Sequence, residues 1–294
     1  LQGLALAEMA YQHSLAYARE RLQGTAPGAE RGVQSPIIEH PDVRRMLMTQ
    51  RSWIDAMRYL MYFNGAALDR SRSNDPEVAE WSTRLAALLI PMSKSIGADV
   101  GNELTSIALQ IFGGMGYVEE TGAAQYLRDI RIAAIYEGTN GIQGQDLVMR
   151  KLGGDQGSTV NEFLASFDDT IAALTADPTM AKFAQELASS FDDVRLASDW
   201  LNANDDDVDK LSGATPYTRL LGTALCGALS GKAALAARAR LHGDGVGDAD
   251  RAFYESKIAS ARFFGEQILP ATSGLAAAVM AGGSDLFAIA TDDF

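Results

Sequence analysis

The chain has 294 residues, 47% of them hydrophobic and 21% charged, a composition that fits a folded globular protein and excludes a disordered tail. Asp and Glu number 38 against 25 Lys and Arg, and the net charge of −13 without a basic patch argues against binding to nucleic acid or an anionic membrane. The single cysteine, Cys226, excludes an internal disulfide, and its apolar surroundings indicate a buried side chain. No uninterrupted apolar run approaches 18 residues and no signal peptide opens the sequence, so we expect a cytoplasmic protein.

The first half of the sequence has a helical pattern, in which apolar residues recur every three to four positions. A loop rich in Pro and Gly interrupts it over residues 24–41, and Pro91 should bend the third helix. The pattern begins at the first residue without an initiator Met or a capping residue, so we expect a preceding part of the protein. The predicted helices cover residues 4–22, 42–71, 76–112, 122–128 and 139–152.

The best candidate for a domain boundary is GGDQGS, residues 153–158, whose composition predicts a flexible joint. Further helical stretches follow it, separated by polar or Gly-rich turns, and no segment is rich in β-forming residues. The sequence therefore predicts an all-α protein, with an antiparallel helical bundle over residues 1–153 and a second helical domain over residues 159–294.

Residues 109–152 contain more unusual residue choices than a packing helix requires. Gly113 and Gly114 fall at a predicted helix end, where a C-terminal cap and a tight turn would also explain them. Glu137 follows an apolar run and precedes Gly138 and Thr139, of which Thr139 can cap the next helix. The carboxylate could simply interact with the helix dipole, but partial burial by the apolar run would raise its pKa towards that of a general base.

Three segments occur in the order and spacing of a known family. QIFGGMGY at 110–117, LRDIRIAAIYEGTNGIQ at 127–143 and AYARERLQG at 16–24 resemble motifs in the C-terminal domain of acyl-CoA dehydrogenases. The resemblance implies FAD-dependent α,β-dehydrogenation of an acyl-CoA thioester. The sequence after residue 152 resembles the additional helical domain of larger members, such as the 3-methylmercaptopropionyl-CoA dehydrogenase type.

The resemblance also implies roles for individual residues. Glu137 matches the base that removes the α-proton, and Gly138 leaves room for the thioester. Thr139 matches a position near the FAD of the same subunit. A second set would contact the FAD of a neighbouring subunit: Gln110, Gly113 and Gly114 through close approach, and Arg21 through the pyrophosphate.

The family implies partners and further domains. We expect an electron-transfer flavoprotein as electron acceptor and a homodimer or dimer of dimers as the assembly. The family's N-terminal helical domain and middle β-domain have no counterpart in these 294 residues, so the chain alone should bind FAD poorly and be inactive.

Two other functions are compatible with the sequence. Acyl-CoA oxidases share the base, and oxygen consumption would separate them from dehydrogenases. A catalytically idle helical scaffold for oligomerisation is the other, although the intact motif residues argue against it. The three histidines lack metal-ligand spacing, so no metal site is expected.

Overall fold

The computed structural model describes residues 1–243 and 246–294, and within these residues every regular element is a helix. The only strand-like pairing there is a single bridge between Leu22 and Pro36. The predicted all-α fold is confirmed. The helices are α1 (Gln2–Glu20), α2 (Pro41–Arg70), α3 (Pro76–Phe112), α4 (Gly114–Tyr117), α5 (Ala123–Ile130), α6 (Asn140–Gln145), α7 (Ser158–Ala165), α8 (Asp168–Thr175), α9 (Ala181–Ala203), α10 (Asp207–Leu241), α11 (Asp248–Phe263) and α12 (Thr272–Val279).

Helices α1, α2 and α3 form the up-down-up framework of the first half. α1 and α3 run in the same direction, because Gly3 contacts Gly97 at one end and Tyr17 stacks on Phe112 at the other, with ring centroids 4.5 Å apart. At the first contact the backbones nearly touch, since a Cβ added to Gly3 would lie 1.7 Å from the carbonyl oxygen of Gly97. Only glycine at residue 3 allows this approach.

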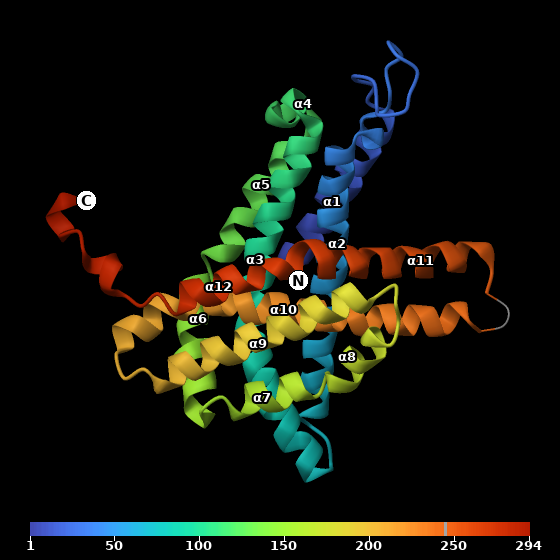
Figure 1. Ribbon diagram of the computed structural model, residues 1–294. Coiled ribbons are helices and arrows are strands. Elements are labelled where there is room, and N and C mark those ends of the chain that lie inside the picture. Colours follow the sequence, from blue (N-terminus) through green and yellow to red (C-terminus); the bar gives the residue numbers. More distant parts are fainter. Residues whose placement is uncertain (244–245) are drawn as a thin grey trace.

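The second half packs directly on the first. In Figure 1, α9, α10 and α11 lie across the direction of α2 and α3, and α10 contacts both of these helices. Trp53 on α2 meets Phe264 edge to face at 4.8 Å, and Phe63 lies 5.8 Å from Phe163. One cluster of buried apolar residues therefore extends through both halves.

The segment between the halves is an ordered turn. The carboxylate of Asp155 accepts hydrogen bonds from the backbone N–H groups of Gly157 and Thr159, at 3.1 and 3.0 Å. Residues 153–158, where we expect a flexible joint, are thus linked by the hydrogen bonds that Asp155 accepts from Gly157, the N-cap residue of α7, and from its first turn. The division into two folding domains stays a prediction.

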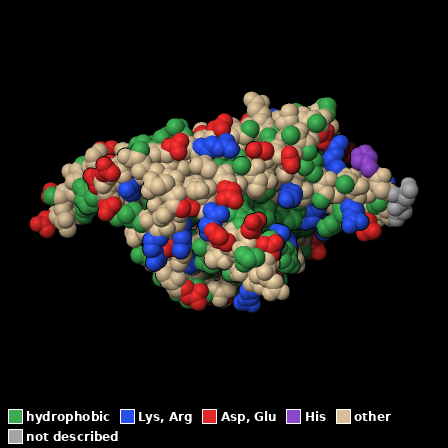
Figure 2. Space-filling view, turned by 90° about the horizontal axis from the view of Figure 1, so that it is seen from below, with side chains coloured by type: hydrophobic (Ala, Val, Ile, Leu, Met, Phe, Trp, Pro, Cys, Tyr) green, Lys and Arg blue, Asp and Glu red, His purple; other side chains and the backbone are tan. Residues whose placement is uncertain are grey.

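Helix α10 is long and apolar enough to cross a membrane by length and composition, but 78% of its most apolar 18-residue stretch is buried inside the protein. Cys226 lies in this stretch and is fully buried. We therefore assign α10 to the core. On the face seen in Figure 2, acidic and basic side chains are interspersed, and no large field of one charge is seen.

Candidate active site

Glu137 lies in the short connection between a helical turn over Arg131–Ala134 and the start of α6. Its backbone has φ of 56°, and the next residue, Gly138, has φ of 78°. The left-handed conformation is ordinary for glycine but costs a residue with a side chain about 1 kcal/mol or more. Gln156 has the same φ of 56°, and at both residues contacts with the surroundings must stabilise this backbone.

Helix α6 supplies part of that stabilisation. The Thr139 hydroxyl accepts a hydrogen bond from the backbone N–H of Ile142 at 3.3 Å, which makes Thr139 the N-cap as predicted. The Gln143 side chain donates to the carbonyl oxygen of Glu137 at 3.4 Å. Gly138 is also tightly placed, since an added Cβ would lie 3.2 Å from the Gln143 amide nitrogen.

The Glu137 side chain is exposed in this chain, so the expectation that the apolar run before it would bury the carboxylate is wrong here. The reason is the helical geometry of that run. Ile130 and Ala133 face the core, whereas Ile132 and Ile135 point outward and are each 51% exposed. The run is thus apolar on two sides but covered on only one.

A cavity of about 230 Å³ lies beside Glu137. Its walls come from Ala133 in that helical turn, from Tyr136 and Glu137 in the connection, from the start of α1 and from α3. The Lys94 side chain on α3 also lines it. Burial lowers the pKa of the Lys94 ammonium, and the negative charges of Asp99 and Glu137 partly offset that effect.

A polar network behind this cavity ties the start of α6 to α3. Lys94 donates to the side-chain oxygen of Asn140 at 2.7 Å, and the Asn140 amide nitrogen donates to the Asp99 carboxylate at 2.5 Å. Burial raises the pKa of the Asp99 carboxyl, although the hydrogen bond from Asn140 and the charge of Arg219 act in the opposite direction. None of these residues was singled out from the sequence, where Lys94 and Asp99 stand out only as charges within the small and apolar stretch MSKSIGADVG.

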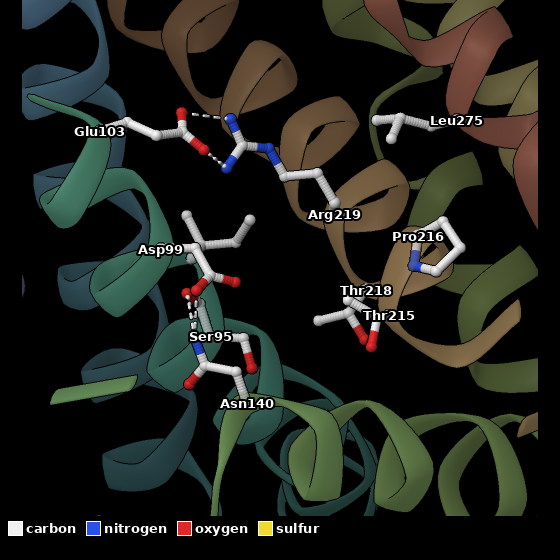
Figure 3. Close-up of a pocket in the computed structure, with 10 residues that line it drawn as sticks. Ser95, Asp99, Glu103, Asn140, Thr215, Pro216, Thr218, Arg219 and Leu275 are labelled. Atoms are coloured by element: carbon white, nitrogen blue, oxygen red, sulfur yellow. Dashed lines mark hydrogen bonds and ion pairs between the residues drawn. The ribbon is translucent and has the colours of Figure 1, made fainter. Parts of the chain in front are cut away.

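Asp99 and Asn140 also line a second cavity, of about 440 Å³, between α3 and α10 (Figure 3). On its α10 side, Arg219 forms a two-pronged ion pair with Glu103, with both N–O distances 2.8 Å. The Ser95 hydroxyl on the α3 side is buried and has no hydrogen-bond partner in the described structure.

The remaining predicted site residues lie at the opposite end of α1 and α3. Gly113 ends α3 with φ of 58° and ψ of −138°, a conformation that is essentially restricted to glycine. Gly113 and Gly114 are exposed, and a Cβ added to either would meet nothing within 4 Å. Gln110 and Arg21 are likewise exposed near this end.

The predicted residues therefore form two groups. Glu137, Gly138 and Thr139 lie together beside Lys94, whereas Gln110, Gly113 and Gly114 lie about 16 residues further along α3. At 1.5 Å per residue this places the groups about 24 Å apart. The two groups therefore lie at different places along α3.

Two family models match the chain. Residues 1–152 match the acyl-CoA dehydrogenase C-terminal domain, and residues 163–290 match the acetyl-CoA dehydrogenase C-terminal-like domain.

The chain is also similar to characterised proteins. It is 38% identical to the 3-methylmercaptopropionyl-CoA dehydrogenase of Ruegeria pomeroyi over 92% of the chain, and 32% identical to a butyryl-CoA dehydrogenase of Syntrophomonas wolfei over 90%. It covers 46% and 44% of these proteins, so it spans slightly less than half of their length.

Solved structures share the fold. An acyl-CoA dehydrogenase of Bacillus anthracis complexed with FAD superimposes with a TM-score of 0.68 at 16% identity, covering 94% of this chain and 46% of that one. Caenorhabditis elegans ACDH-11 in complex with C11-CoA gives 0.66 at 20% identity, covering 91% and 41%. With the two family models matching in sequence order and the dehydrogenase from Ruegeria similar across both, the chain belongs to the acyl-CoA dehydrogenase family.

Proposed function

We propose that this chain is the base-bearing part of a FAD-dependent acyl-CoA dehydrogenase. The observation that carries the proposal is Glu137, a carboxylate held in a left-handed backbone at the head of a capped helix and beside a cavity. It stands at the position that the family resemblance assigns to the base.

In the proposed reaction, the Glu137 carboxylate removes a proton from the α-carbon of the acyl thioester while a hydride leaves the β-carbon, and a double bond forms between the two carbons. FAD, when bound, supplies the electron acceptor for that hydride. Glu137 and Gly138 are both suited to this geometry. The turn at Gly138 presents the carboxylate outward, and the missing side chain leaves space for the thioester next to the base.

The exposure of Glu137 fits a site that other parts of the protein complete. The relatives are about twice as long as this chain, and a carboxylate that reacts beside a flavin must be shielded from water when substrate is bound. We propose that the bound acyl chain and the rest of the protein cover the Glu137 carboxylate, which the Ile132 and Ile135 side chains leave exposed.

The second group suits a flavin nucleotide. The open backbone at Gly113 and Gly114 leaves room for a ring system to approach the N–H and C=O groups closely. The Arg21 guanidinium is exposed near the same end and can pair with a pyrophosphate. The family resemblance assigns these residues to the FAD of a neighbouring subunit, and we therefore propose a homodimer or a dimer of dimers.

Anaerobic mixing of saturated acyl-CoA thioesters with the FAD-loaded full-length enzyme, in which this chain is joined to the rest of the protein, tests the reaction class. We expect bleaching of the flavin absorbance and a product that is two mass units lighter than the thioester. Absence of both with every chain length would contradict the proposal and leave the idle scaffold as the better account.

The electron acceptor needs a second measurement. Reoxidation of the reduced flavin by an electron-transfer flavoprotein, with slow reoxidation by oxygen, is expected for a dehydrogenase. Fast oxygen consumption with release of hydrogen peroxide would identify an oxidase.

A further inference from the structure

Asn140 makes contacts that an ordinary first-turn helical residue does not need. Its side chain is half-buried between α6 and α3, and both the oxygen and the nitrogen of its amide group form hydrogen bonds. The oxygen accepts from the Lys94 ammonium, while the nitrogen donates to the Asp99 carboxylate. Asn140 therefore bridges a cation and an anion that are five residues apart on α3.

The arrangement is chemically specific to an amide. Aspartate at residue 140 could accept from Lys94 but could not donate to Asp99, and its charge would repel that carboxylate. A serine would be too short to reach both partners. Hydrogen bonds to charged groups are about twice as strong as those between neutral groups, and here both bonds are of this kind.

The bridge lies where the loop needs support. Glu137 adopts its left-handed conformation three residues before Asn140, and such a conformation persists only where the surroundings over-determine it. Thr139 and Gln143 hold the loop to its own helix, but neither ties it to the rest of the protein. The contacts of Asn140 with Lys94 and Asp99 tie the end of the loop to α3, while the Tyr136 hydroxyl, which donates to the Gln2 side chain, ties its beginning to α1.

The second half of the chain also contributes to the surroundings of Asp99 and of α6. Arg219 on α10 carries a positive charge near Asp99 and is itself held by Glu103 (Figure 3). Helix α6 packs closely on α10, because a Cβ added to Gly144 would lie 3.0 Å from the carbonyl oxygen of Ala214. Helix α6 is thus held to α3 by Asn140 at its start and to α10 by Gly144 near its end.

We propose that Asn140 is a positioning residue for the base, and that its bridge between Lys94 and Asp99 fixes the orientation of the Glu137 loop. This inference rests on the proposed function of Glu137. If the bridge positions the base, the hydrogen bonds among Lys94, Asn140 and Asp99 are required for fast proton removal and not for substrate binding.

The test uses the FAD-loaded holoenzyme with Asn140→Asp, Asp99→Asn and the double variant that combines them. The double variant exchanges the amide and the carboxylate, so residue 99 can again donate to residue 140 while Lys94 keeps its acceptor. We expect Asn140→Asp to slow flavin reduction in a single turnover by about 10- to 100-fold, with substrate binding changed less than about 3-fold. The double variant should recover most of the lost rate.

Asn161→Asp on α7 is the matched control, since residue 161 is exposed and the same charge is added away from the site. It should react like the wild type. Crystal structures supply a readout apart from activity. Residue 137 should leave the left-handed region in Asn140→Asp and return to it in the double variant.

A full rate in Asn140→Asp would overturn the inference, and so would a folded double variant that recovers no activity. If Asn140→Asp does not fold, the double variant decides alone. Glu137→Gln separates this result from the proposed function. Activity in Glu137→Gln contradicts the role of the base itself, whereas an inactive Glu137→Gln with a fully active Asn140→Asp contradicts only the positioning role.

Discussion

The Asp55 carboxylate on α2 accepts a hydrogen bond of 2.6 Å from the Lys257 ammonium on α11, across 202 residues of sequence. Asp55 is only 3% exposed and also interacts with Arg51 and Arg58, whose side chains reach solvent, and with the Ser260 hydroxyl. A buried carboxylate with several cationic partners fixes the second half of the chain on the first.

Asp55→Asn should therefore destabilise the protein. The neutral amide leaves the half-buried Lys257 without a counter-charge, and we expect a loss of about 2 to 3 kcal/mol, less than for a fully buried pair because Lys257 and the arginines contact water. Denaturant unfolding measures the change. Asp42→Asn, which breaks an exposed ion pair with Arg45, should change stability by less than about 0.5 kcal/mol; equal effects of the two substitutions would contradict the account of Asp55.

Gly3→Ala tests the close contact of α1 with α3 beside the base. The added Cβ would overlap the Gly97 carbonyl, so the helices must separate, with a loss of about 1 to 3 kcal/mol. Gly65→Ala is the matched substitution on α2, where an added Cβ meets nothing within 4 Å. It should stabilise the protein by about 0.5 to 1 kcal/mol. Thermal unfolding of both variants gives the comparison, and unchanged stability in Gly3→Ala would show that the contact is not tight.

Cys226 should be unreactive in the folded protein. Burial raises the pKa of its thiol to about 12, so almost no thiolate is present at pH 8 and the sulfur is inaccessible. Because the folded pKa lies above the ordinary value of 9.0, this group contributes stability that is fully present below pH 9 and is lost as the pH rises towards 12. Labelling with iodoacetamide at pH 8 should be slow in buffer and complete in denaturant, whereas rapid labelling in buffer would show that α10 is not packed as described.

Gly113→Ala and Gly114→Ala distinguish two reasons for a glycine at these positions, namely an unusual backbone conformation and close contact with FAD. Gly113 has a conformation that disfavours any side chain, so Gly113→Ala should cost about 1 to 3 kcal/mol of stability. Gly114 is helical and unhindered, so Gly114→Ala should fold as well as the wild type. If FAD lies against this backbone, Gly114→Ala should nevertheless release FAD more readily in gel filtration. Equal FAD retention in Gly114→Ala and wild type would contradict the assignment of Gly114 to the cofactor.

Local patterns predicted the helices and the cap well. The apolar periodicity and the Pro76 and Thr139 signals located the bundle helices to within a few residues. The apolar run before Glu137 was misleading, because periodicity does not say which side another part of the protein covers. Contacts between distant residues were also missed. The bridge from Asn140 to Lys94 and Asp99 joins positions more than 40 residues apart, and the Gly3 contact depends on how α1 meets α3.

The central claim is that the Glu137 carboxylate removes the α-proton, and single-turnover flavin reduction by acyl-CoA in Glu137→Gln tests it most directly. Glutamine keeps the size of the side chain and removes its basicity, so we expect the rate to fall by about 1,000-fold while FAD and acyl-CoA still bind. Glu120→Gln, at an exposed residue away from the cavity, should react at the wild-type rate. A Glu137→Gln enzyme that reduces its flavin nearly as fast as the wild type would contradict the account.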